Sequence, residues 1–280
     1  MKVTVITINY NNLNGLKRTI PSVLSQTCDD FEFIVIDGDS TDGSKEYIEL
    51  QNGISQWVSE KDKGIYNAMN KGVSMAHGDY CIFMNSGDHF FSPFSLENAC
   101  KELDGTDYCV GRTAIVDGNY LTFSIPPAHM TSHFIRITNL QHQSTFIKTS
   151  LLREYPYDEN LEITSDWVHF FELWHRKKCT YKAIETITSA FYTDGISANH
   201  SKVIREERKL ALDRLKKGNI DMPGLKTKEE KLEWQTYRLD YKLQGAMKKK
   251  PLSRDWKVMR NGFKSFFKDL FISLGIISYS

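Results

Sequence analysis

The sequence predicts an α/β protein built on a mostly parallel sheet flanked by helices, with a helical extension at its C-terminal end. Short apolar runs at residues 3–8, 31–36, 57–58 and 80–84 are typical of buried strands. Helical periodicity lies between these runs, and the alternation of strand, loop and helix favours a parallel sheet. A chain of 280 residues with 40% hydrophobic residues is long enough for one large domain with an appendage.

The first half of the chain repeats one pattern. The helices expected between the strands cover residues 13–25, 45–51 and 65–77, and Gly78 is expected to cap the last of them. Each strand ends in a polar loop, and the carboxyl ends of parallel strands meet at one edge of the sheet, where ligands of open α/β sheets bind. The loops therefore bring five side chains to that edge: Tyr10, Asp37, Asp39, Asp62 and Asp88.

The second half is less regular. Residues 108–123 predict two strands joined by a tight turn at 117–119, and residues 125–140 predict a loop. A helix is expected to begin near Asp166, because aromatic residues recur after it at helical spacing. A strand at about 181–187 and a charged helix ending at 217 follow. The stretch Met222-Pro223-Gly224 is typical of a boundary, so the expected domains are 1–224 and 225–280.

The two expected domains differ in charge. Residues 225–280 carry 13 Lys and Arg against 6 Asp and Glu, whereas residues 1–224 have an acidic excess. Over 254–277 apolar and basic residues separate onto opposite faces of a helix, as in helices that lie in a membrane interface. Such a helix could instead pack on its own domain or on a second subunit of a homodimer. Its wide aromatic face does not suit a phosphate backbone, so we expect no nucleic-acid partner.

Cysteine usage and the N-terminal residues bear on location. The five cysteines show no CxxC spacing, which predicts neither a disulfide framework nor a zinc site. The chain turns polar at residues 9–12, too early for a signal peptide. No run of about 18 apolar residues is present. We therefore expect a cytoplasmic protein, or one at the inner face of the plasma membrane.

Several linked motifs resemble those of one family. They are Val5-Ile6-Thr7-Ile8-Asn9-Tyr10-Asn11, Ser40-Thr41-Asp42-Gly43, Glu60-Lys61-Asp62-Lys63-Gly64-Ile65-Tyr66-Asn67, Met84-Asn85-Ser86-Gly87-Asp88, Gln141-His142-Gln143 and Ser165-Asp166-Trp167. Together they resemble family 2 glycosyltransferases with the GT-A fold, and within them the branch that builds bacterial surface polysaccharides of the colanic-acid type. The resemblance covers roughly residues 1–200 and leaves the C-terminal extension out.

This resemblance implies inverting transfer of a sugar from a UDP or GDP type donor to a hydroxyl of a lipid-linked or growing glycan, with Mn²⁺ or Mg²⁺ as cofactor. Asp88 matches the last acidic residue of the family's metal-binding motif, and a hard divalent cation prefers such oxygen ligands. Asn85 and Gly87 stand where the family has further acidic residues. His200 could complete the metal shell or be an ordinary surface histidine.

The resemblance also assigns residues to the nucleotide. Tyr10 matches the position whose ring stacks on the nucleobase; its alternative is an aromatic residue of the core. Asp37 matches the first of two acidic residues after the second strand, and because Gly38 replaces the second, either Asp37 or Asp39 could read the base. Asp62 and Lys63 match the loop that the family uses against the nucleoside and phosphates. Each of these charged residues could equally belong to a solvated turn.

Asp166 matches the family's catalytic base, which deprotonates the acceptor hydroxyl. Its alternative is an ordinary helix N-cap, where Asp is also favoured. His142 could equally be a satisfied core histidine. Segments that the family places beside the acceptor or the donor sugar contain Asn85, Gln141, His142, Gln143 and Trp167.

Two competing functions follow from the same residues. A nucleotidyltransferase that makes nucleotide-sugars has a related sheet but normally a Gly-rich basic loop after its first strand, which Asn9-Tyr10-Asn11-Asn12 is not. A catalytically impaired or non-catalytic relative that binds nucleotide or glycan is favoured by Asn85 and Gly87. The sequence determines neither the donor sugar nor the acceptor, because loop geometry decides specificity on such folds.

Overall fold

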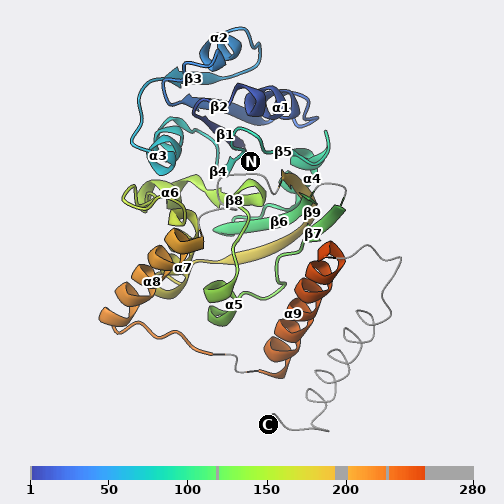
Figure 1. Ribbon diagram of the computed structural model, residues 1–280, viewed down its shortest axis with the longest axis vertical. Coiled ribbons are helices and arrows are strands. Elements are labelled where there is room, and N and C mark those ends of the chain that lie inside the picture. The colour runs from blue at the N-terminus through green and yellow to red at the C-terminus, as the bar shows by residue number, and fades with distance from the viewer. Residues whose placement is uncertain (1, 118–119, 193–200, 225–226, 250–280) are drawn as a thin grey trace.

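The computed structural model describes residues 2–117, 120–192, 201–224 and 227–249 (Figure 1). The predictions for His200 and for the helix at 254–277 lie outside these residues. The described strands form one mixed sheet in the order β3-β2-β1-β4-β8-β6-β9-β5, with β7 paired to β6. The predicted α/β sheet flanked by helices is therefore confirmed.

The first half of the sheet is parallel, as expected. Its strands are β1 (Val3–Asn9), β2 (Phe31–Asp37), β3 (Gln56–Ser59) and β4 (Tyr80–Phe83), joined by α1 (Leu13–Leu24), α2 (Ser44–Glu49) and α3 (Ile65–Met75). Alternate residues of a strand point to opposite faces. In β1, Ile6 and Ile8 face α3, whereas Val3 and Val5 face α1, so both faces are apolar and covered.

The second half of the sheet departs from the parallel pattern. Its strands are β5 (His89–Phe90), β6 (Tyr108–Asp117), β7 (Tyr120–Ser124), β8 (Thr145–Lys148) and β9 (Tyr181–Tyr192). Strand β8 lies antiparallel between β4 and β6, while β6 and β9 pair in parallel. The sheet as a whole is mixed because β8 joins its two parallel parts in the opposite direction.

Helices outside the parallel half cover the two faces of the sheet. On one face lies α4 (Ser95–Glu102), next to α1 and α2. The other face carries α5 (Ser132–Ile137), α6 (Thr149–Glu154), α7 (Ser165–Arg176) and α8 (Ser201–Lys217), together with α3. A fully buried aliphatic or aromatic side chain in these layers contributes roughly 1.5–3 kcal/mol relative to its exposed state.

Two local predictions are wrong. Helix α3 ends at Met75, and Gly78 does not cap it, since the capping residue is Ala76 in an extended conformation. Gly78 is required for another reason: a side-chain carbon there would lie 2.7 Å from the backbone nitrogen of Thr4 in β1. Residues 125–140 are not all loop, because α5 begins after Thr131, whose hydroxyl accepts a hydrogen bond from the Phe134 backbone N–H (3.1 Å).

The last described helix, α9 (Lys228–Lys249), packs against the rest of the molecule. The Trp234 ring lies 4.8 Å from the His133 ring and 5.7 Å from that of Tyr237, which in turn lies 4.7 Å from Phe134 of α5. Figure 1 shows α8 beside α7 and α9 on the far side of α5. Among the described helices none is both long and apolar enough to cross a membrane.

Candidate active site

The carboxyl ends of β1, β2 and β3 are tied together by the buried carboxylate of Asp37. It accepts hydrogen bonds from Asn9 Nδ2 (2.7 Å), Ser40 Oγ (2.6 Å) and Ser59 Oγ (2.7 Å), and from the Ser40 backbone N–H (2.9 Å). Burial alone would raise the pKa of Asp37, but these donors together hold it below its usual value. The Asp37 carboxylate is therefore buried and fully engaged in hydrogen bonds within the protein.

The residues around Asp37 do reach the surface. Tyr10 is 67% exposed, so it is not the core aromatic of the alternative reading. A side-chain carbon at Gly38 would lie 2.5 Å from Asp62 Oδ2 and 3.1 Å from the Tyr10 ring, so these two side chains lie close together over a bare stretch of backbone. Asp39 is exposed in the left-handed region (φ 64°), and Lys63 is exposed as well. Tyr10, Asp39, Asp62 and Lys63 thus remain available to a ligand.

The loop after β4 is held by helix α1. Asn12 Nδ2 donates to the Ser86 carbonyl oxygen (2.9 Å), and the Thr19 hydroxyl donates to that of Asp88 (2.6 Å). Gly87 is in the left-handed region (φ 111°), which a glycine adopts without strain, and its N–H donates to Thr19 Oγ1 (2.9 Å). The backbone that carries the Asp88 side chain is therefore held in place by α1 and its N-cap residue.

His142 joins Asp88 to Asp166. Its Nε2 lies 3.4 Å from Asp88 Oδ2, and its Nδ1 lies 3.7 Å from Asp166 Oδ2. The three residues come from the loop after β4, the short 3-10 helix η1 (His142–Ser144) and the first turn of α7. Residues that lie 54 and 24 positions apart in the chain thus form one row of carboxylate, imidazole and carboxylate.

The two carboxylates change the charge of His142. Burial works against an imidazolium, but hydrogen bonding and charge from Asp166 and Asp88 raise the pKa of His142 to about 10. At neutral pH both ring nitrogens therefore carry a proton. Asn85 Nδ2 lies 3.2 Å from His142 Nε2, and a half turn of this amide would present Oδ1, which is buried and has no hydrogen-bond partner, to that N–H.

Asp166 lies one residue inside α7, so the N-cap alternative is wrong. The N-cap residue is Thr164, and Asp166 Oδ1 accepts from the Trp167 backbone N–H (2.8 Å). Tyr66 Oη, which donates to the Ile163 carbonyl oxygen (2.6 Å), lies 3.2 Å from Asp166 Oδ1. Tyr66 belongs to the motif after β3, yet its link to Asp166 could not be read from the sequence.

The predicted sugar-binding residues divide into two groups. His142 belongs to the row of charged groups, and Asn85 lies beside it, with Nδ2 3.2 Å from His142 Nε2. Trp167 is 5% exposed, with Phe171 stacked on one side (4.6 Å) and the Arg208 guanidinium 4.7 Å from its ring, and its Nε1 donates to the Ile135 carbonyl oxygen. Gln143 is fully buried. Gln141 is half-buried, and its backbone carbonyl accepts from the Thr145 hydroxyl (2.7 Å), so this segment mainly supports His142.

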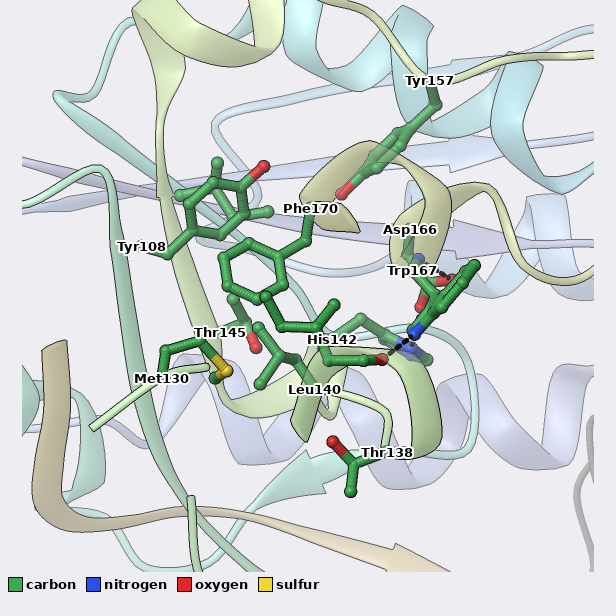
Figure 2. A pocket seen from close by; sticks show the side chains of 12 residues that line it. Tyr108, Met130, Thr138, Leu140, His142, Thr145, Tyr157, Asp166, Trp167 and Phe170 are labelled. Carbon is green, nitrogen blue, oxygen red and sulfur yellow. Dashed lines mark hydrogen bonds and ion pairs between the residues drawn. The ribbon is translucent and has the colours of Figure 1, made fainter. Parts of the chain in front are cut away.

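An apolar cavity lies behind this row (Figure 2). Asp166, Trp167 and His142 lie together at one side of it, and Tyr108, Met130 and Phe170 line other parts of its wall. Its volume of about 20 Å³ is enough for a water molecule and far too small for a sugar ring. Any sugar must therefore bind outside it, where Asp88 and Asp166 are partly exposed.

The ligands that the described residues of the site offer to a divalent metal are few. Among the described residues no group of three or more His, Cys, Asp or Glu is arranged to hold a metal ion. Mg²⁺ bound with phosphates needs less from the protein, namely one or two carboxylates beside substrate oxygens and water. The partly exposed carboxylate of Asp88 fits that smaller donor set, although His142 pairs with it here.

Comparison with known proteins decides the family. The family model described as glycosyl transferase family 2 matches residues 4–160, which contain the loops after β1, β2 and β3 together with Asp88 and His142. The chain belongs to glycosyltransferase family 2. This glycosyltransferase is 32% identical over 205 residues to an uncharacterized glycosyltransferase of Mycobacterium tuberculosis, covering 70% of this chain and 77% of the relative. A PGL/p-HBAD biosynthesis glycosyltransferase of Mycobacterium bovis is 27% identical over 175 residues, covering 59% and 66%.

Solved structures agree with the fold. The glycosyltransferase is similar to residues 1–349 of S. aureus TarS in complex with UDP-GlcNAc, with a TM-score of 0.62 and 15% identity over 99% of this chain and 84% of that one. The mannosyltransferase PcManGT of Pyrobaculum calidifontis, in complex with GDP-Man and Mn²⁺, gives a TM-score of 0.57 and 16% identity over 99% and 76%. These similarities establish the GT-A type of fold.

Proposed function

We propose that this glycosyltransferase moves a sugar, with inversion, from a UDP or GDP type donor to a hydroxyl of a lipid-linked or growing surface glycan. The observation that carries the proposal is the row formed by Asp88, His142 and Asp166 beside the loops of β1 to β3. It offers one carboxylate toward the nucleotide side and another toward the acceptor side. The structural neighbours bind UDP-GlcNAc and GDP-Man, which supports this donor class.

The nucleotide is assigned to the loops that follow β1, β2 and β3. Tyr10 stacks on the base, and Asp62 and Lys63 approach the nucleoside and phosphates. The side chains of Tyr10 and Asp62 both lie over Gly38. Between the two acidic candidates for base reading, Asp39 is the exposed one. Asp37 supports these loops from beneath through its four hydrogen bonds.

Asp88 is the residue that would hold Mn²⁺ or Mg²⁺ together with the donor diphosphate. A bound divalent cation neutralises the charge that develops on a diphosphate leaving group. His142, which is cationic at neutral pH and lies 3.4 Å from Asp88, contributes positive charge at the same place. Asn85 orients that imidazole.

Asp166 is the base. It removes the proton of the acceptor hydroxyl, whose oxygen then bonds to the anomeric carbon of the sugar. The bond between that carbon and the diphosphate oxygen breaks, and its electron pair leaves with the nucleoside diphosphate. Because attack and departure take place on opposite faces of the sugar, one displacement inverts the configuration.

The acceptor and the location follow from weaker similarities. The branch resemblance, together with the relative whose name refers to PGL/p-HBAD biosynthesis, favours a cell-surface glycan or glycolipid as acceptor. A lipid-linked acceptor would place the enzyme at the cytoplasmic membrane face, with residues 225–280 as a basic extension that contacts the membrane. A contact of this extension with a second subunit is the alternative.

Donor binding is tested by thermal shift with UDP, GDP, dTDP and CMP, each with Mn²⁺, Mg²⁺ or EDTA. A ligand that binds the folded state raises Tm according to its occupancy. We expect one diphosphate to raise Tm in a metal-dependent manner and Asp88→Asn to abolish that dependence. A metal-independent shift that Asp88→Asn leaves unchanged would remove the metal from the proposal.

The role of Asp166 is tested with Asp166→Asn, assayed by release of the nucleoside diphosphate. Removal of a general base costs about 100- to 10,000-fold in rate, while donor binding should stay as in the wild type. A folded wild type that binds donor but releases no nucleotide with any acceptor would instead favour the catalytically impaired relative.

A further inference from the structure

Helix α8 holds the segment that leads into α7. Glu207 Oε1 accepts from the Glu162 backbone N–H (2.5 Å), and Oε2 accepts from those of Ile163 (3.2 Å) and Thr164 (2.9 Å) and from the Thr164 hydroxyl (2.8 Å). One carboxylate from another helix thus binds three successive amides just before α7. Thr164 makes no side-chain cap to α7, because its hydroxyl is engaged with Glu207.

The next residue of α8, Arg208, contacts Trp167 in the first turn of α7. The Arg208 guanidinium lies 4.7 Å from the centre of the Trp167 ring, and its Nη2 donates to Asn139 Oδ1. The other side of the Trp167 ring carries Phe171. Burial lowers the pKa of Arg208, and the negative charge of Asp166 partly offsets this effect, so the cation and the carboxylate are electrostatically coupled.

We propose that Glu207 and Arg208 are positioning residues for the catalytic base: Glu207 fixes the backbone that precedes Asp166, and Arg208 fixes Trp167 and supplies positive charge beside the Asp166 carboxylate. The inference rests on the proposed role of Asp166. Neither residue belongs to the motifs of the family resemblance, and both lie on a helix whose sequence reads as a charged, solvated one.

Simple helix packing accounts for less than is observed. Packing of α8 on the core needs its apolar residues, of which Ala211 and Leu215 are buried. Glu207 and Arg208 lie about one turn before Ala211 and about two turns before Leu215, and their charged groups contact the residues before and after Asp166, namely 162–164 and Trp167. A displacement of about 1 Å at a reacting group costs on the order of 100-fold in rate. Contacts that fix the backbone around Asp166 can therefore affect the rate strongly.

Other groups also face Asp166, and they define what the test must separate. His142 Nδ1 approaches from η1 and Tyr66 Oη from α3, while the buried Tyr157 and His169 lie close enough for their pKa values to depend on its charge. From α8, the Arg208 guanidinium packs on the ring of Trp167, the residue after Asp166, and is coupled to the charge of Asp166. Replacement of Arg208 therefore removes one cation near Asp166 and leaves His142 in place.

The experiment compares matched substitutions on α8 in the full chain. Glu207→Gln keeps the shape but turns one oxygen into a donor facing backbone N–H groups, and Glu206→Gln makes the same change at an exposed neighbour. Arg208→Gln removes charge and stacking, Arg208→Lys keeps the charge, and Lys209→Gln is the exposed control. Nucleoside diphosphate release is measured with UDP-GlcNAc or GDP-Man over a panel of alkyl glycosides, with Tm and donor binding measured in parallel.

We expect Glu207→Gln and Arg208→Gln to lower kcat about 10- to 100-fold with the donor KM unchanged, and both controls to match the wild type. In Arg208→Gln the acid limb of the kcat–pH profile should move to higher pH, because an anionic base loses a nearby cation, and Arg208→Lys should restore that limb. Folded variants with wild-type kcat and pH profile would overturn the inference, as would a loss confined to donor binding. If Asp166→Asn itself retained full activity, the proposed function would fail instead.

Discussion

His142 is the residue on which the two halves of the site depend electrostatically. Its imidazole lies between two carboxylates that would otherwise repel each other across the site, and its side chain is 28% exposed. A cation held between two anions is stabilised by both of them, which is why its pKa rises to about 10 despite burial.

Replacement of His142 should destabilise the protein in a pH-dependent way. A raised folded-state pKa contributes stability that is fully present below the unfolded value of 6.5 and is lost as pH rises toward about 10. We expect His142→Gln to lower the free energy of unfolding by about 1–3 kcal/mol at pH 6, since it leaves two carboxylates without their cation. The difference from wild type should shrink between pH 7 and pH 10.

Urea unfolding across this pH range measures the effect. The control is His129→Gln, which makes the same change at a side chain that is 82% exposed. A His142→Gln deficit that grew with rising pH would contradict the assignment of a charged His142.

At the scale of elements, the proposed nucleotide site is formed by the loops after β1, β2 and β3. Asp37 binds the ends of all three strands through Asn9, Ser40 and Ser59, so that the strands end at a common level. Tyr10, Asp39 and Asp62 project from these ends. In the proposed site Asp37 would therefore affect the nucleotide through the backbone, whereas Asp39 would affect it by contact.

This distinction predicts opposite behaviour of two neighbouring acids. Asp37→Asn should lower the free energy of unfolding by about 2–4 kcal/mol at pH 7, because its amide would place a donor against other donors. A lowered folded-state pKa contributes stability above the unfolded value of 3.8, so the deficit should fade as pH drops below about 4. Asp39→Asn should leave stability unchanged and weaken nucleotide binding.

Chemical unfolding and nucleotide titration of the two variants decide the matter. Equal stability of both variants would show that the hydrogen bonds of Asp37 contribute little. Unchanged nucleotide affinity in Asp39→Asn would move base recognition to another side chain.

At the scale of the molecule, the body and its extension meet at α9. The rings of Trp234 and Tyr237 pack against His133 and Phe134, so α9 belongs physically to the body, although the predicted boundary at 224 precedes it. The charge surplus of residues 225–280 is a property of the whole extension, and α9 contains part of it. A membrane role is therefore best tested on the residues after 249.

Truncation after 249 should separate the two contributions of the extension. We expect a chain of residues 1–249 to keep the wild-type Tm and nucleotide binding but to lose sedimentation with vesicles that contain anionic lipid. Truncation after 224 should lower Tm, since it exposes Phe134. Vesicle binding that survives in 1–249 would contradict a membrane contact through 254–277, and a change in subunit number would favour the homodimer.

The parallel half of the fold could be predicted because its signals are local. Short apolar runs specify strands β1 and β2, and apolar residues at helical spacing specify α1 and α3, whichever neighbours they meet. The prediction for the end of α3 is wrong because Gly78 is required by its close approach to Thr4 of β1 and not by the helix. Strand β8, with four residues, is too short for periodicity to identify.

The motifs alone indicated that the chain is a sugar-transferring enzyme. The order of strands and loops indicated which loops meet at the edge of the sheet, because the carboxyl ends of parallel strands lie at the same edge. They did not indicate that Asp37 and Trp167 are buried, that His142 bridges Asp88 and Asp166, or that α8 reaches the base through Glu207 and Arg208. These relations join residues that are dozens of positions apart, and burial and charge coupling arise only from such contacts. A sequence pattern records the type of each side chain, whereas its neighbours in the folded chain determine what that side chain can do.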